Sequence, residues 1–525
     1  MLASAVSKME EASAKPTALL IPLLPPAKPD PYLSFEAQTL PATSQRRQSR
    51  SSLTRTRWLI CGLLVAFWVW SSRRTWKKTQ VTVAPFFHNI SEPGELCPAI
   101  AGPGISHAGY IGLKGDSKET PKKSFFWLFE AENDSENAPI ILTIGGGPGT
   151  SGLSNPMAVQ GPCRIVDGPP EPNPNRWTEH FNLLALDHPI GAGFSFGAMV
   201  NNSRDAAVDV YDFLQKFYTV FPQFAENPLV LSGGSYGGTY VPHIATVIHE
   251  QNLLVAKHKG QPGAIPIHLE SLMVSNPISD AASHFRWMLY ERCTLFDNMY
   301  NATTCAELAP VLPACLDAIE FAQQTKDWNP ERHNAVFEIC MPLAMGDTHG
   351  TVVEDTRQKC DAKDTMECLP PSFFAMQDFF RRADVKDALS VPAHVNFTFV
   401  SEAVNQEFVK YGDLVQSAYL LYTPLLKAGI RLLHYVGAQD ANCAWPGVIS
   451  FVKLIQSPFQ KQFLSLPDIP WPTEASKTTA RVVGPGAGNF TWILIDGGGH
   501  FVAKDQPVLT KKIVETWVHN EPFFD

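Results

Sequence analysis

Short apolar runs of strand length recur along the chain, and they restrict the folds that are open to it. They are bounded by Gly, Pro and Asp and cover residues 125–129, 139–144, 181–186, 229–231, 271–274, 430–436 and 491–495. Continuous runs of this length are typical of strands buried on both faces, as in a parallel or mixed sheet. Segments with helical periodicity separate the runs; one of them, residues 205–217, has Val210, Phe213 and Phe217 on one face. The pattern predicts an α/β fold.

A Cys-rich, Pro-punctuated stretch interrupts this alternation. Six of the ten cysteines fall in it, at positions 293, 305, 315, 340, 360 and 368. Their spacing does not repeat as paired C-x-x-C knuckles, which favours disulfides over zinc ligation. We predict a cap inserted at 283–385 and stapled by three bridges, within an α/β domain that covers 86–282 and 386–525. The connectivity stays open, although Cys360 and Cys368 are the closest candidates.

The N-terminal part of the chain has a different composition. Residues 1–57 are rich in Pro, Ser and Thr and predict a disordered tail. Residues 58–72 are uncharged, apolar and flanked by arginines, but they are shorter than the roughly 20 residues that span a bilayer. We predict a short transmembrane signal-anchor there, followed by a linker at 73–85. The alternatives are a cleaved signal peptide, which would give a secreted or vacuolar protein, and a buried core helix.

Charge and glycosylation motifs indicate the compartment of the body. The chain carries a formal charge of −9 although its first 78 residues are basic, so the remainder is strongly acidic. An acidic body argues against a nucleic-acid groove, since phosphate binding needs clustered cations. Six N-x-[S/T] sequons follow the apolar segment, at Asn89, Asn133, Asn201, Asn301, Asn396 and Asn489. With the cysteines, they predict a lumenal or extracellular body in the secretory pathway.

A G-x-S-x-G motif occurs twice, around Ser195 and around Ser235. In a nucleophile elbow, the serine sits between the end of a strand and the start of a helix, which holds its hydroxyl at the sheet edge. Ser235 follows an apolar run and precedes helical periodicity over 240–254, whereas Ser195 follows a loop rich in Gly and Pro. The context predicts Ser235 as the nucleophile and a structural role for Ser195.

A nucleophilic serine needs a base and an acid that orients this base. In α/β-hydrolases both follow the serine, each on a loop after a strand. Asp440 follows the run 430–436 and His500 follows the run 491–495 through a Gly-rich turn. They are therefore predicted as acid and base. Two other histidines are weaker candidates for the base, because His434 lies inside a strand pattern and His519 is in the terminal tail.

The glycines after the run 139–144 predict an oxyanion hole. Gly-rich turns expose backbone N–H groups, and here Gly147 would donate together with Tyr236. A phosphate-binding loop is the alternative for such a turn, but the Lys and Ser/Thr of a P-loop are missing. We expect no metal and no cofactor.

Five segments in order resemble the serine carboxypeptidase family. They are Gly145–Ser151, Asp187–Ser195, Gly233–Gly238, Gly437–Trp445 and Gly499–Val502. The resemblance covers about residues 86–525 and implies an α/β-hydrolase sheet with a Cys-rich inserted cap. It also implies the same triad, with substrate-binding positions at Gly145, Gly146, Val159, Gly234, Cys443 and Phe501.

This sequence departs from the family where members bind the substrate's C-terminal carboxylate. Members use an Asn and two Glu residues at the positions of Gly145, Val159 and Gly234, which cannot supply those side chains. The family's Met after the catalytic His is Phe501. Arg164 and His188 are the nearest polar replacements, although Arg164 is better interpreted as a surface residue.

Three functions fit these observations. The first is a serine carboxypeptidase-like hydrolase that cleaves peptides through an acyl-enzyme. The second is an acyltransferase, esterase or peptidase on the same scaffold that does not require a free C-terminal carboxylate. The third is a non-catalytic binding or protective protein, against which the complete triad counts. The expected partners are a peptide or acyl substrate and, through residues 58–72, a membrane.

Overall fold

The computed structural model describes residues 87–524, apart from 101–103, 297–298, 325–327 and 361–364. The predicted tail at 1–57, the membrane segment at 58–72 and the linker at 73–85 lie outside the described residues. Within the described part of the chain, no helix combines the length and the apolar character needed to cross a membrane.

The middle of the central sheet is parallel. Its strands, in spatial order, are β7 (Asn182–Leu186), β4 (Ile140–Ile144), β9 (Leu229–Gly234), β10 (Leu269–Ser275), β13 (Arg431–Gly437) and β16 (Phe490–Ile495). Antiparallel strands extend one edge, namely β3 (Lys122–Phe129), β2 (Ser106–Gly112), β1 (Phe87–Ser91) and β8 (Phe196–Gly197). The other edge carries β15 (Thr479–Val483) and β14 (Ile469–Pro470). Each apolar run predicted as a strand forms one, so the α/β prediction is confirmed.

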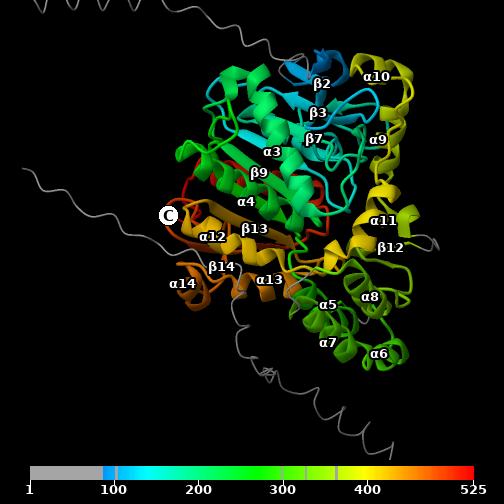
Figure 1. Cartoon of the computed structure of the whole chain (residues 1–525). Helices are drawn as coiled ribbons and strands as arrows, with labels where there is room; N and C mark the ends of the chain where they lie inside the picture. Colours follow the sequence, from blue (N-terminus) through cyan, green and yellow to red (C-terminus); the bar gives the residue numbers. More distant parts are fainter. Residues whose placement is uncertain (1–86, 101–103, 297–298, 325–327, 361–364, 525) are drawn as a thin grey trace, which may run out of the picture. The chain divides into compact units, whose positions relative to one another are not determined.

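Both faces of the sheet are buried by helices. On one face, Leu142 and Leu231 join a core with apolar residues of the helices α3, α4, α12, α13 and α14. On the other face, Ile141 and Val230 join a second core with α9, α10 and α16. Figure 1 shows α3 and α4 lying across the front of the sheet. Burial on both faces explains why the strands read as continuous apolar runs.

The helices of these layers have the following bounds. They are α3 (Ser203–Val220), α4 (Gly237–Ala256), α9 (Pro371–Arg381), α10 (Ala383–Ala388), α12 (Tyr422–Lys427), α13 (Trp445–Leu454), α14 (Gln460–Ser465), α15 (Val502–Asp505) and α16 (Pro507–Val518).

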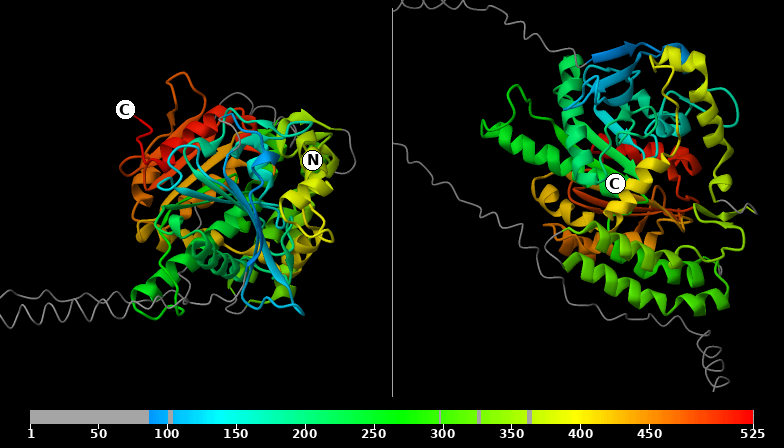
Figure 2. Two further views of the ribbon diagram at one scale, coloured as in Figure 1. Left: turned by 90° about the horizontal axis from the view of Figure 1, so that it is seen from above. Right: turned by 45° about the vertical axis from the view of Figure 1, so that its right-hand side comes forward.

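A long segment between β10 and β13 contains the predicted cap. Its other elements are α5 (Ala281–Tyr290), α6 (Ala302–Leu308), α7 (Val311–Gln324), α8 (Pro330–Cys340), β11 (Thr351–Val352), β12 (Asp355–Lys359) and α11 (Glu402–Tyr411). Helices α5, α7 and α8 share a small core of their own, which includes Phe285 and Ile319. In Figure 1 and in the right-hand view of Figure 2 these helices form one group below the sheet. Helix α9 lies inside 283–385 and α10 begins there, but both pack on the sheet.

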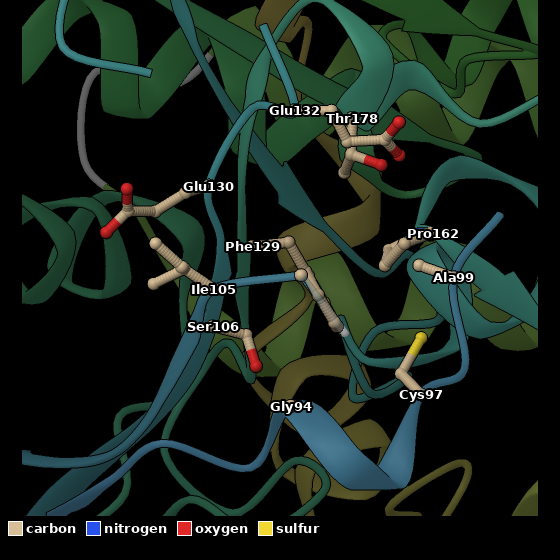
Figure 3. Close-up of a pocket in the computed structure, with 11 residues that line it drawn as sticks. Gly94, Cys97, Ala99, Ile105, Ser106, Phe129, Glu130, Glu132, Pro162 and Thr178 are labelled. Atoms are coloured by element: carbon tan, nitrogen blue, oxygen red, sulfur yellow. The ribbon is translucent and has the colours of Figure 1, made fainter. Parts of the chain in front are cut away.

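Four disulfides cross-link the described residues. Three lie in the Cys-rich stretch, as predicted: Cys293–Cys305, Cys315–Cys340 and Cys360–Cys368. The fourth, Cys97–Cys163, was not predicted, because its cysteines are 66 positions apart in segments without a shared pattern. Figure 3 shows Cys97 and Pro162 at a small pocket that contains none of the predicted triad residues.

Candidate active site

Ser235 occupies a strained turn between β9 and α4. Its φ is +59°, in the left-handed region that non-glycine residues rarely adopt. Hydrogen bonds fix this conformation: its N–H donates to the Ser275 carbonyl over 3.1 Å, and its carbonyl accepts from Gly238 and Ile278, each over 2.9 Å. A Cβ on Gly234 would lie 2.6 Å from the Ser275 hydroxyl oxygen, so the turn packs closely on the end of β10. This is the geometry of a nucleophile elbow.

Ser195, in the other G-x-S-x-G motif, is buried and fully hydrogen-bonded. Its hydroxyl accepts from the Phe125 N–H over 2.8 Å and donates to the Asp187 carbonyl over 2.7 Å. These bonds tie β3 to the loop after β7. The local geometry is that of a structural residue.

His500 and Asp440 are paired in a buried position. The His500 Nδ1 lies 2.8 Å from the Asp440 Oδ2, and Asp440 has no exposed surface. Burial lowers the pKa of His500, but the charge of Asp440 and their hydrogen bond raise this pKa well above its ordinary value. The other oxygen of Asp440 accepts from the N–H groups of Asn442 and Cys443. The carboxylate is thereby held in one orientation toward the imidazole.

Asn276 is a member of this site that the sequence did not reveal. It follows β10, is completely buried, and donates from Nδ2 to the Asp440 Oδ2 over 2.6 Å. Its Oδ1 accepts from the Gly437 N–H over 3.2 Å. The amide thus joins β10 to the end of β13, where Asp440 is placed.

Cys443 connects the predicted base with the predicted nucleophile. Burial raises the pKa of its thiol, while the charge of His500 and hydrogen bonds with His500 and Ser235 lower it. A carboxylate oxygen of Asp440, the Sγ of Cys443 and a ring nitrogen of His500, each able to bind a metal ion, lie within 4.8 Å of one another. Such a trio is able to bind a metal, but Asp440 and His500 already hydrogen bond to each other.

The glycine loop after β4 packs directly on the elbow. A Cβ on Gly146 would lie 2.6 Å from the Gly234 carbonyl oxygen and 2.9 Å from the Ser235 Cβ. Gly147 has a φ of +106°, which only glycine adopts without strain. The loop and the backbone of Tyr236 therefore approach the Ser235 side chain without intervening side chains.

The residues at the positions where family members bind the substrate's carboxylate are apolar or lack a side chain. Val159 lies in a short helical turn and is 5% exposed. Phe501 packs against Phe373 of α9, with ring centres 4.6 Å apart, and its ring centre lies 5.3 Å from that of His500. A Cβ on Gly145 would come within 2.1 Å of the Thr150 carbonyl oxygen, so this position has no room for a side chain.

The two polar replacements considered from sequence have other contacts. Arg164 pairs with Glu171 over 2.9 Å at the surface, as expected for a structural arginine. His188 is buried against the Tyr240 ring, and burial lowers the pKa of His188 to about 3. Its imidazole is therefore neutral at physiological pH.

His434 and His519 lie in other surroundings. The ring of His434 packs between those of Tyr422 and Phe451 in the core. His519 contacts His180 and Phe181 after α16.

Comparison with known proteins identifies the family. Residues 98–520 match the serine carboxypeptidase family, so the chain belongs to that family. Carboxypeptidase Y homolog A of Arthroderma otae is 28% identical over 438 residues, which cover 80% of this chain and 75% of that protein. The Aspergillus niger homologue is also 28% identical, over 453 residues that cover 82% of this chain and 75% of its own.

A solved structure shares the fold. The crystal structure of Kex1ΔP, a prohormone-processing carboxypeptidase from Saccharomyces cerevisiae, matches with a TM-score of 0.65 and 20% identity. The match covers 82% of this chain and 95% of that one. The protein is a serine carboxypeptidase-like hydrolase with an α/β-hydrolase fold, and its disulfides fit maturation in the oxidising secretory pathway.

Proposed function

We propose that Ser235, His500 and Asp440 hydrolyse peptides through an acyl-enzyme. The proposal is supported by the hydrogen-bonded Asp440–His500 pair: Cys443 lies within 4.8 Å of both, and burial raises the pKa of its thiol while His500 and Ser235 of the strained elbow lower it. Neutral His500 accepts the Ser235 proton while the hydroxyl oxygen attacks the scissile carbonyl. Asp440 stabilises the resulting imidazolium.

The acyl-enzyme forms when the peptide C–N bond breaks. His500 then donates its proton to the leaving amine, and the Ser235 oxygen stays bonded to the acyl carbon. Water attacks this carbon in the second half and gives a proton to His500. The bond between the Ser235 oxygen and the acyl carbon then breaks, His500 returns the proton to the Ser235 oxygen, and the carboxylic acid leaves. The N–H groups of Gly147 and Tyr236 would stabilise the oxyanion in both halves.

The proposed substrate is a peptide whose C-terminus need not be a free carboxylate. Gly145 and Gly234 supply no side chain, Val159 is apolar, and Phe501 adds an aromatic ring beside His500. Gly146 packs on the elbow and Cys443 contacts the triad, so these two would border the acyl group. The same surroundings support the second candidate, an esterase or acyltransferase, because esters and amides lack the negative charge that the family's clamp binds.

A fluorophosphonate probe tests the assignment of the nucleophile. We expect Ser235→Ala to abolish covalent labelling and Ser195→Ala to leave it, provided that both proteins are folded by circular dichroism. Labelling that survives in Ser235→Ala and disappears in Ser195→Ala would refute the assignment. Labelling of neither wild type nor variants would favour the non-catalytic alternative.

The proposed location is a membrane-anchored protein with a lumenal or extracellular catalytic domain. It is supported by the apolar segment 58–72 in the sequence and by exposed sequon side chains at Asn133, Asn301 and Asn396. Alkaline carbonate extraction and glycosidase treatment of the full chain from a eukaryotic host test it. Release into the carbonate supernatant, or no mobility shift after glycosidase, would contradict the anchor or the glycosylation, respectively.

A further inference from the structure

A hairpin from the Cys-rich segment contacts both loops of the proposed triad. It consists of residues 351–359, with β11 and β12 as its strands, and we call it the strap hairpin (β12 in Figure 1). It ends next to Cys360, whose N–H donates to the Gly350 carbonyl and whose disulfide partner is Cys368. Its sequence position lies about 80 residues before Asp440, in a region predicted only as a cap.

Three hydrogen bonds join the strap hairpin to the Asp440 loop. The Ala441 N–H donates to the Val353 carbonyl over 2.9 Å, and the Thr356 N–H donates to the Gln439 carbonyl over 3.0 Å. The side chains of Thr356 and Gln439 also hydrogen bond, over 2.9 Å. The residues immediately before and after Asp440 are therefore both held by this hairpin.

Further contacts join it to the His500 loop. The His500 N–H donates to the Glu354 carbonyl over 2.6 Å. The Arg357 guanidinium donates to the Gly497 carbonyl over 2.7 Å and lies 3.7 Å from the Asp505 carboxylate. Asp505 in turn accepts from the Gly499 N–H, next to His500. Thus the hairpin binds the backbone of His500 itself and the turn that precedes it.

Glu354, whose carbonyl accepts the His500 N–H, also carries a carboxyl group that interacts electrostatically with His500. The Glu354 side chain is half-buried; burial raises its pKa, the charge of His500 lowers it, and the charge of Asp440 raises it. Arg292 donates to the Ala441 carbonyl over 3.3 Å, and its positive charge also lowers the pKa of Glu354. Asp440 and Cys443 act on the pKa of His500, and the charges of Glu354 and His500 interact.

We propose that the strap hairpin positions the Asp440 and His500 loops, and that Glu354 is a positioning residue whose charge favours the protonated state of His500. The inference rests on the proposed function, since it requires His500 to be the base. A negative charge beside the imidazole opposes its deprotonation. Wild-type enzyme would then need a higher pH to reach full activity than the same site without this charge.

Glu354→Gln tests the electrostatic part, because glutamine keeps the size of the side chain and the backbone bond to His500. We expect the ratio of the variant's kcat/KM to the wild-type kcat/KM to rise by about three- to tenfold as the pH falls through the acidic limb of the pH profile. At the plateau of the profile, the two kcat/KM values should agree within about twofold. Glu307→Gln removes the same charge from the exposed surface of α6 and serves as control. Superimposable pH profiles for Glu354→Gln and wild type would overturn this part.

Arg357→Ala tests the positioning part. We expect kcat to fall about tenfold with KM within twofold, since a displaced His500 loop impairs proton transfer rather than binding. Arg382→Ala, which breaks a surface pair with Asp384, is the matched control. The Tm of the variant shows that it is folded, and the control should keep the wild-type Tm. An unchanged kcat in folded Arg357→Ala would refute the positioning part. Activity that persists in Ser235→Ala would instead refute the proposed function.

Discussion

The Tyr236 hydroxyl donates a 2.6 Å hydrogen bond to the Asp413 carboxylate, 177 positions away in the sequence. Asp413 is buried and also accepts from the hydroxyl and the N–H of Ser203, at the start of α3. Burial raises the pKa of Asp413, while the hydrogen bonds from Ser203 and Tyr236 lower it. Because Tyr236 follows Ser235, this bond fixes the residue whose N–H is proposed to stabilise the oxyanion.

Asp413→Asn should therefore weaken the oxyanion hole. We expect a fall in kcat of about tenfold with a small change in KM, since an oxyanion donor acts in the transition state and its complete removal costs about 100-fold or more. Steady-state kinetics below the Tm of the variant measure this. Tyr236→Phe removes the same hydrogen bond, so the double variant should be no slower than the slower single variant. Additive losses would contradict a shared role.

Peptides that differ only at the C-terminus test the loss of the carboxylate contacts. A hydrogen bond to a charged group contributes about 1.5–3 kcal/mol, so losing even one of them reduces the preference for a free acid by about 10- to 150-fold, and losing two or three reduces it further. We expect similar kcat/KM for the free-acid and amide forms of one peptide.

The control for this measurement is a family member that retains the Asn and both Glu residues. It should favour the free acid in the same assay. A strong preference of this protein for the free acid, with an optimum well below pH 6, would show that another group binds the carboxylate.

Much of the fold was predictable because local patterns specify it. The strands of the parallel sheet are buried on both faces, so their composition alone marks them. Ser235 could be predicted as the nucleophile because an elbow requires a strand before it and a helix after it, and both are visible in the sequence. Asp440 and His500 follow strands directly, so their loops meet at the same sheet edge.

The missing parts depend on contacts between distant segments. Asn276 and Asp413 are single polar residues whose partners lie 164 and 177 positions away, and no periodicity marks them. The strap hairpin lies in a stretch where cysteines and prolines replace strand and helix patterns. The sequence shows that Gly145 lacks a side chain, but only the backbone shows that Thr150 blocks its replacement.

The Cys315–Cys340 bridge should stabilise the small core of α5, α7 and α8. Both cysteines are completely buried in that core, and a loop of this size contributes about 3 kcal/mol through the unfolded chain. We expect a Cys315→Ser, Cys340→Ser double variant to be cut by protease within 302–343 under conditions where the wild type is intact. Peptide mapping locates the cuts. First cleavage in the sheet strands would contradict local unfolding of this segment.

Glu291 should make the stability of the protein fall as the pH rises. It is 3% exposed, and burial raises its pKa from 4.5 to about 8, although the Gly447 N–H and Arg292 oppose this. Between these two values the unfolded chain releases the proton and the folded chain keeps it. The unfolded state then binds fewer protons, so the free energy of unfolding decreases with pH, by at most about 1.4 kcal/mol per pH unit from this group.

Glu291→Gln removes this titration and still accepts the Gly447 N–H, which lies 3.2 Å from the Glu291 Oε1. We expect the variant to lose less unfolding free energy than wild type between pH 5 and pH 8, measured by urea denaturation of the full chain. Other buried acids, such as Asp187 with a pKa raised to about 6, are present in both proteins and cancel in the difference. Glu307→Gln, at an exposed site, should keep the wild-type slope. Parallel stability curves for wild type and Glu291→Gln would show that Glu291 is ionised in the folded protein throughout this range.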